Sequence, residues 1–171
     1  MPLDAGTGQS KQFKTRSKQA ARGQDAIKLL KTDHDDVADL FGQYEKVKNR
    51  DESKKADLID QICTALSLHA QIEEEIFYPA ARNALEEDGE ELLDEAEVEH
   101  GSIKSLVEQL EIMSPDDELC NATVKVLSEY VEHHVKEEEG KIFPKLRKTD
   151  LDLDALGEEL SERKAELMAE R

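Results

Sequence analysis

Apolar residues recur every three to four positions from about residue 25 onward, which is the period of amphipathic helices. Four segments of about 25–30 residues follow this period, and a shorter one comes after them. Proline occurs late in the second segment, at Pro79, and near the end of the fourth, at Pro144, so we expect a kink or an end of the helix there. The pattern predicts helices at about 25–48, 53–85, 91–113, 115–141 and 154–170.

Turn-forming residues separate the long segments at 49–53, 86–89 and 114–117. Asp51 or Ser53 can cap the second helix, and Ser114 can cap the fourth, with Pro115 at its first position. Four long amphipathic helices with such short turns predict an all-α fold, an antiparallel up-down-up-down four-helix bundle. The fifth helix either docks on this bundle or mediates self-association, because leucines line one side of it: Leu153, Leu156, Leu160 and Leu167.

Composition supports an all-helical domain. The 171 residues include 8 Gly, 4 Pro and only 4% aromatic residues, whereas the helix-forming Ala, Leu, Glu and Lys are frequent. The length suits one domain with tails. We divide the chain into a flexible, disordered basic arm (1–24), a four-helix bundle (25–148) and a short C-terminal amphipathic helix (149–171).

Charge is distributed unevenly. The whole chain carries −18 and residues 1–24 carry +4, which leaves −22 on residues 25–171. A body this acidic repels phosphate backbones, so we expect no nucleic-acid binding by the folded part. No segment approaches the ~20 apolar residues of a membrane span, and the arm lacks the apolar stretch of a secretory signal. Two cysteines, Cys63 and Cys120, make no disulfide framework and suit a cytoplasmic location.

The chain contains an internal repeat, and each copy carries histidines on its apolar stripes. The stripe of the first helix is Ile27, Leu30, His34, Val37 and Phe41, and at an offset of 66 the third helix has Leu93, Ala96, His100, Ile103 and Val107. The stripe of the second helix is Ile62, Leu66, His69, Glu73 and Phe77, and at an offset of 65 the fourth has Leu127, Val131, His134, Glu138 and Ile142. The sequence therefore predicts two helical hairpins of one design.

The histidines are expected at one level of the bundle. Residues on adjacent antiparallel helices lie level when they are equally far from the turn between them. The midpoints of successive histidine pairs are 51.5, 84.5 and 117, each in or beside a predicted turn. All four histidines should therefore lie within one helical turn of ~5 Å. Glu73 and Glu138 follow their histidines by four residues, which places them one turn away on the same faces.

A purely structural role for these side chains is the alternative to a ligand site. A single histidine on an apolar face is usually a hydrogen-bonded core residue, and a glutamate–histidine network without metal is an alternative. Here four of the five histidines share one layer with two glutamates, on stripes otherwise filled by apolar residues. Burial of unpaired carboxylates is strongly unfavourable. A bound cation is the simplest way to satisfy all six groups.

The donor set constrains the metal. Four imidazoles and two carboxylates exceed the needs of one tetrahedral zinc, and calcium or magnesium sites do not use four imidazoles. The layer has no thiolate, which excludes an iron–sulfur cluster. Mixed nitrogen and oxygen ligation favours iron, with manganese, cobalt or zinc as alternatives. Two metals bridged by Glu73 and Glu138, with two imidazoles each, leave room for an oxo or hydroxo bridge and for an open position.

The pattern His34, His69-Ala-Gln-Ile-Glu73, His100 and His134-Val-Lys-Glu-Glu138 resembles the hemerythrin-like domain (HHE cation-binding) family. The segments HAQIEEEIFYP and HHVKEEEGKIFP are typical of it, and the resemblance covers about residues 25–148. It implies a four-helix bundle with a non-haem di-iron centre. Family members handle oxygen, nitric oxide or peroxide, sense iron or oxygen, or repair damaged iron centres.

The chain departs from two branches of that family. Oxygen-carrying hemerythrins have five histidine ligands, two of them on the third helix, and an aspartate on the fourth. Here Lys104 follows His100 by four residues, and that helix has no second ligand. Iron-centre repair proteins carry a cysteine-bearing N-terminal segment, whereas residues 1–24 contain no cysteine. Reversible oxygen transport and repair are therefore disfavoured.

Side chains near the expected ligands leave alternatives open. His133 and Glu137 have the same spacing as His134 and Glu138, but the repeat favours His134 and places His133 at the core edge or in solvent. Tyr130, one turn before His134, either supports the ligands or packs with its hydroxyl at the surface. Four glutamates are expected on solvated faces: Glu74, Glu75, Glu137 and Glu139.

We expect a protein that binds or senses oxygen, nitric oxide or peroxide at a carboxylate-bridged pair of iron ions. The expected ligands are His34, His69, Glu73, His100, His134 and Glu138. The alternatives are a peroxide-degrading enzyme of catalase or peroxidase type, with only Tyr130 and His133 as possible acids or bases, and an iron-storage, iron-centre repair or structural zinc protein. We expect a small diatomic molecule or peroxide as partner, and a monomer or weak homodimer.

Overall fold

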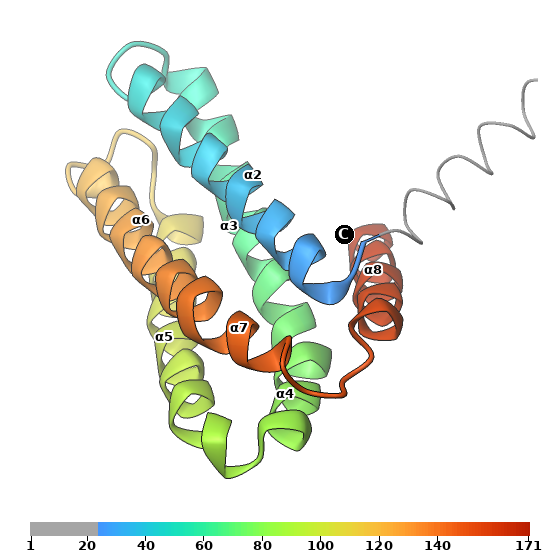
Figure 1. Cartoon of the computed structure of the whole chain (residues 1–171). Coiled ribbons are helices and arrows are strands. Elements are labelled where there is room, and N and C mark those ends of the chain that lie inside the picture. Colours follow the sequence, from blue (N-terminus) through green and yellow to red (C-terminus); the bar gives the residue numbers. More distant parts are fainter. Residues whose placement is uncertain (1–23) are drawn as a thin grey trace, which may run out of the picture.

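The computed structural model of the chain describes residues 24–171, which form helices and turns and no strand. Four long helical runs lie antiparallel, and a fifth helix packs beside them (Figure 1). The prediction of an all-α bundle with a C-terminal fifth helix is confirmed. Apart from Gln24, the predicted basic arm at 1–24 lies outside the described residues.

Each hairpin pairs an uninterrupted helix with a segmented one. The uninterrupted helices are α2 (Ala26–Val47) and α5 (Glu87–Ile112). The segmented partner of α2 consists of α3 (Glu52–Ile72), η1 (Glu73–Phe77) and α4 (Tyr78–Leu85). The segmented partner of α5 consists of α6 (Cys120–Glu137), η2 (Glu138–Ile142) and α7 (Phe143–Leu146). The fifth helix is α8 (Leu153–Ala169).

The two short segments η1 and η2 are π-helical turns, and they occur where the prolines were expected to kink the helices. Each begins at a glutamate of the predicted site, Glu73 or Glu138. Each proline then falls in the first turn of the next helix, where its missing N–H costs little. Each helix therefore accommodates one extra residue in a π turn and continues without a break.

The turns differ in detail from the predicted ones. Asp51 caps α3 by accepting from the backbone N–H of Lys54 at 3.1 Å. The fourth helix begins at Cys120 and not at Pro115, because residues 114–119 form their own turn hydrogen bonds. Pro115 lies within this turn, and its carbonyl accepts a hydrogen bond of 2.5 Å from Lys55 Nζ.

The turn between α4 and α5 is shorter than the predicted 86–89. Glu86 alone links the two helices, and its φ of 51° lies in the left-handed region. Gly89 is already inside α5, where a Cβ atom would lie 2.6 Å from Leu85 Cβ. Glycine at this position therefore permits the close approach of α4 and α5.

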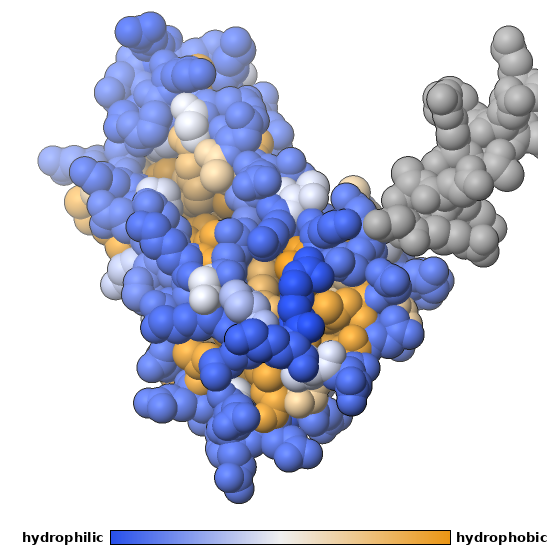
Figure 2. Space-filling model, in the orientation of Figure 1, coloured by the Kyte–Doolittle hydropathy of each residue, from blue (hydrophilic) through white to orange (hydrophobic). Residues whose placement is uncertain are grey.

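The interior consists of two apolar cores. The first core lies towards α4, α7 and α8 and includes Leu30, Phe77 and Leu93. The second core lies towards the opposite end and includes Val37, Leu66 and Ile103. Hydrophilic side chains cover most of the face shown in Figure 2, with apolar patches between them. No described helix is long and apolar enough to span a bilayer.

Candidate metal centre

The structure brings the six predicted site residues together between the two apolar cores. Every one of the six side chains is buried, and both glutamates have no exposed surface at all. Each helical run of the bundle contributes: His34 from α2, His69 from α3, Glu73 from η1, His100 from α5, His134 from α6 and Glu138 from η2.

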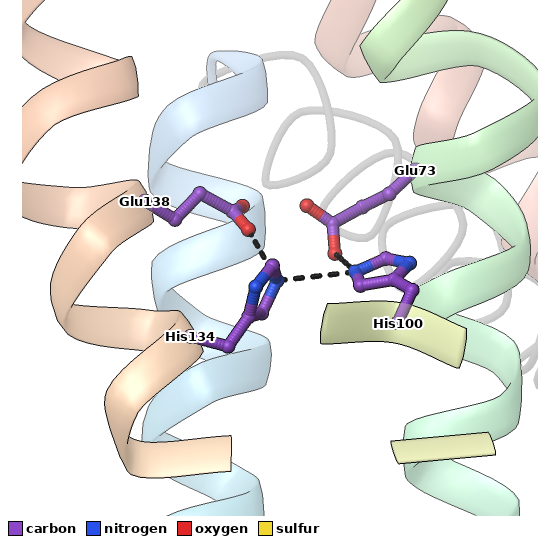
Figure 3. Close-up of side chains that lie close together, drawn as sticks. All are labelled: Glu73, His100, His134 and Glu138. Atoms are coloured by element: carbon purple, nitrogen blue, oxygen red, sulfur yellow. Dashed lines mark hydrogen bonds and ion pairs between the residues drawn. The ribbon is translucent and has the colours of Figure 1, made fainter. Parts of the chain in front are cut away.

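The six side chains form two overlapping groups whose nitrogen and oxygen atoms lie within 4.8 Å of one another. We call the group of Glu73, His100, His134 and Glu138 group B, and its side chains converge in Figure 3. We call the group of His34, His69 and Glu138 group A. Glu138 belongs to both groups, so that two cations would share it.

The two carboxylates face imidazoles from different helices. Glu138 Oε2 lies 2.8 Å from His134 Nε2, and its Oε1 lies 3.9 Å from His34 Nε2. Glu73 Oε1 lies 2.7 Å from His69 Nε2 and 3.5 Å from His100 Nε2. Each carboxylate therefore spans the space between two histidines, as a bridging ligand does.

Several of these buried atoms form no hydrogen bond of good geometry among the described residues, although some of them lie close together. They are His34 Nε2, His69 Nε2, both carboxylate oxygens of Glu73, and Glu138 Oε1. A buried polar atom without a partner typically costs about 1–3 kcal/mol, and charged groups cost more. A bound cation would satisfy these atoms at once, and imidazole nitrogen with carboxylate oxygen is a donor set that suits iron. The residues present therefore fit a metal centre.

Each histidine turns its Nε2 inward and its Nδ1 towards an outer carboxylate. Since a carboxylate only accepts, each Nδ1–H is the donor, which leaves Nε2 to face the centre. The hydrogen bonds are His34 to Glu139 (3.0 Å), His69 to Asp33 (3.0 Å), His100 to Glu74 (3.0 Å) and His134 to Glu99 (3.5 Å).

These outer carboxylates correct part of the sequence prediction. Glu74 and Glu139 were expected on solvated faces, but both orient histidines of the site. Asp33 and Glu99 were not singled out at all. A helical period identifies the face on which a residue lies, whereas these contacts cross from one helix to another. The one signal available was that Asp33 directly precedes His34 and Glu99 directly precedes His100.

Protons compete with a cation for this centre. Burial lowers the pKa of His69, but the carboxylates of Glu73 and Asp33 outweigh it and raise the pKa to about 10. Burial also lowers the pKa of His134, and Glu138 with Glu99 raises it to about 10. Burial and the carboxylate of Glu73 raise the pKa of Glu138 to about 8. A cation therefore has to displace protons held between the imidazoles and the carboxylates.

Tyr78 is a site residue that the sequence analysis missed. Its hydroxyl donates to Glu138 Oε2 at 3.1 Å and lies 3.0 Å from His100 Nε2 and 3.3 Å from His134 Nε2. Burial, with Glu73 and Glu138 nearby, holds its pKa well above the usual range. By contrast Tyr130, the predicted candidate, is 48% exposed on α6. The phenol group of Tyr78 thus lies within hydrogen-bond distance of side chains in group B.

The two copies of the internal repeat carry different residues at the position of this tyrosine. Tyr78 follows Glu73 by five residues, and Phe143 follows Glu138 by five. The π turns place both rings over the centre: Tyr78 lies 5.2 Å from the His100 ring, and Phe143 stacks on His34 at 6.0 Å between ring centroids. Group A therefore faces an apolar ring where group B faces a hydroxyl.

The other neighbours lie outside the cluster. His133 has 68% of its side chain exposed and contacts Glu99 at 3.4 Å, in agreement with its expected position at the core edge or in solvent. Glu75 pairs with Arg163 on α8 at 2.7 Å, and Glu137 pairs with Lys141 at 2.7 Å. Both buried cysteines are free, as expected.

A small cavity of about 20 Å³ adjoins all four histidines on the side of the second core. Apart from Asp33 and the histidines, apolar side chains line it: Val37, Leu66, Ala70, Ile103, Val131 and Val135. A space of this size holds about one water-sized molecule. An apolar lining favours a small neutral molecule over an ion.

Fold and site together define a helical-bundle protein with a buried cation centre built from histidine and glutamate. The model of the hemerythrin HHE cation binding domain matches residues 25–146, which is most of the chain. The chain belongs to this family.

Two known proteins resemble the chain. A DNA nickase from Nostoc sp. is 34% identical over 131 residues, which are 76% of this chain and 35% of that protein. The chain therefore spans about a third of this curated relative. The crystal structure of a hemerythrin HHE cation binding domain-containing protein from Mycobacterium kansasii superposes with a TM-score of 0.70 at 23% identity, over 84% of this chain and 86% of that chain. This second likeness shows the shared fold.

Proposed function

We propose that the protein holds two non-haem iron ions and uses them to bind or sense a small oxidant, namely oxygen, nitric oxide or peroxide. The observation that carries the proposal is the pair of overlapping ligand groups with Glu138 in both. His34 and His69 would hold one ion, His100 and His134 the other, and Glu73 and Glu138 would bridge them. An iron pair would supply open coordination positions and one-electron redox chemistry.

The surroundings of the centre support a diatomic or similarly small ligand. The cavity of about 20 Å³ beside the histidines admits little more than one small molecule. Its apolar lining keeps bulk water away from that side. Tyr78 can donate a hydrogen bond on the group B side, whereas Phe143 offers only an apolar ring on the group A side. A ligand at one metal position could therefore accept a hydrogen bond, whereas a ligand at the other would contact an apolar ring.

Metal analysis and absorption spectroscopy test this proposal directly. We expect two iron ions per chain, near-ultraviolet bands of a bridged ferric pair, and a change of these bands on reduction and on addition of nitric oxide or peroxide. His134→Ala should abolish them, whereas His133→Ala should retain them. About one zinc per chain, with no such bands, would instead indicate a structural zinc bundle.

A peroxide-degrading enzyme is the second candidate, and Tyr78 is the observation that favours it. Its hydroxyl hydrogen-bonds Glu138 and lies within 3.3 Å of two imidazole nitrogens, so it could pass a proton at the centre. Steady-state peroxide turnover that falls in Tyr78→Phe would support this activity. A protein that reacts once with peroxide but does not turn over would support binding or sensing.

The Nostoc relative is named a DNA nickase, and this chain matches about a third of its length. We propose that the folded body of this chain does not engage nucleic acid, because residues 25–171 carry −22. The metal-loaded protein should leave supercoiled plasmid intact, and nicking by the wild type that is lost in His134→Ala would contradict this. We also propose a monomer or weak homodimer in the cytoplasm, which sedimentation and fractionation would test.

A further inference from the structure

Helix α8 lies beyond the matched residues 25–146, yet it is an integral part of the fold. Figure 1 shows it beside the bundle, and it packs against α2, α3 and η1. Leu160 has no exposed surface, and Leu156 and Leu167 are buried with it in the first core. At Gly157 the backbone comes so close to α2 that a Cβ atom would lie 2.5 Å from the Gln24 carbonyl oxygen. The position of α8 on the bundle is therefore closely fixed.

A lysine of α8 reaches the outer carboxylate of His69. Lys164 Nζ donates a hydrogen bond to Asp33 Oδ1, and Asp33 Oδ2 accepts from His69 Nδ1 at 3.0 Å. One carboxylate thus joins the ammonium group of α8 to an imidazole of group A. The connection runs from the C-terminal helix to the metal centre through a single side chain.

Asp33 is the outer carboxylate for which such a partner matters most. Its side chain is 8% exposed, whereas Glu139, Glu74 and Glu99 are 33%, 32% and 20% exposed. An exposed carboxylate oxygen can bind water, but a buried one needs a partner within the protein. Lys164 supplies that partner for Asp33. On the group B side, Lys104 pairs with Glu74 Oε2 at 2.5 Å, but both of these side chains are more exposed.

We propose that Lys164 is a positioning residue for His69, that it acts through Asp33, and that α8 thereby sets the affinity of one of the two metal positions. The proposal rests on the metal centre argued above. Without the ammonium group, Asp33 can turn towards the groove of about 360 Å³ that Asp33 and Lys164 both line. His69 then loses the hydrogen bond that fixes its ring and its tautomer.

Arg163 provides a matched control on the same helix. Its side chain is 28% exposed, against 29% for Lys164, and it also carries one positive charge. Arg163 pairs with Glu75 and also with Glu166 and Glu170 near the end of the chain. Glu75 accepts from Gln71 as well and forms no hydrogen bond or ion pair with a histidine among residues 24–171. Loss of Arg163 removes a cationic side chain of similar exposure from α8 but leaves the Asp33–His69 hydrogen bond in place.

Anaerobic titration of the chelator-treated full chain with Fe(II), and with Co(II) for its absorption spectrum, tests the proposal. Wild type should take up two equivalents. Lys164→Met should weaken one of the two by up to 10- to 100-fold, the effect of losing a group such as Asp33 that directly orients a ligand, and should change the Co(II) bands. Arg163→Met should leave both equivalents and the bands unchanged, and Lys164→Arg should restore most of the affinity. Melting curves of the metal-free variants report whether α8 stays docked.

An Asp33→Asn background shows whether Lys164 acts through Asp33. In that background, Lys164→Met should cause no further loss of affinity. Equal losses in Lys164→Met and Arg163→Met, or a further loss in the Asp33→Asn background, would overturn the proposal. If wild type takes up two metals and Lys164→Met equals it, the role of Lys164 fails while the centre stands. If wild type takes up no metal, both fail.

Discussion

Removal of metal should destabilise the protein, and the size of the effect follows from the number of sites. The structure offers two overlapping ligand groups, each of which could hold one ion. Each ion adds about 2.7 kcal/mol to the free energy of unfolding when its free concentration is 100 times its Kd. Two ions then add about 5 kcal/mol. A chain of this length gains roughly 2–4 °C in Tm per kcal/mol, so chelation should lower Tm by roughly 10–20 °C.

Calorimetry of the metal-loaded and the chelator-treated protein measures this difference, with metal content checked on the same samples. Adjacent histidines of α6 provide a matched pair of variants. His134→Ala should abolish about half of the difference, because His134 belongs to one of the two ligand groups and faces Glu138 at 2.8 Å inside the bundle. His133→Ala should preserve it, because that side chain is 68% exposed.

An unchanged melting curve after verified metal removal would refute the inference of a buried centre. Equal responses of the two histidine variants would refute the assignment of His134 as the ligand. A His134→Ala variant that loses stability without metal but keeps the full gain in Tm on metal binding would point to a purely structural role for that side chain.

Three further predictions concern Tyr78, the pH dependence of stability, and two glycines outside the centre. Tyr78→Phe should alter the absorption bands of the metal-loaded protein, whereas Tyr44→Phe, which removes a part-buried hydroxyl hydrogen bond to Asn121 beside the second core, should leave the bands unchanged. Between pH 7 and 10 the Tm of the metal-free protein should fall, because two histidines with pKa values of about 10 stabilise the fold fully below their unfolded pKa of about 6.5 and lose that contribution as pH rises. The Tm gain on adding Co(II) should grow over the same range, and a constant gain would contradict proton competition. Gly157→Ala should lower Tm despite better helix propensity, because its Cβ atom would clash with the backbone before α2. Gly42→Ala, with open space around it, should raise the free energy of unfolding by up to about 1 kcal/mol, and Tm with it.

The sequence by itself determined the bundle and the set of six inward-facing side chains. Helical periodicity assigns each residue to a face of its own helix, and the repeat offset of 65–66 residues assigns it a level. These two rules were enough to place the four histidines at one level, because short turns leave antiparallel neighbours little freedom of register. The four are His34, His69, His100 and His134.

The tertiary structure decided what surrounds those six residues. Tyr78 lies five residues after Glu73, out of phase with an α-helix, and the π turn of η1 brings it over the centre. Asp33, Glu74 and Glu139 meet histidines of other helices or segments, and no period within one helix encodes such a contact. Lys164 reaches Asp33 only because α8 docks beside α2. Local pattern fixes which way a side chain points along its own helix, whereas the packing of helices fixes what it meets there.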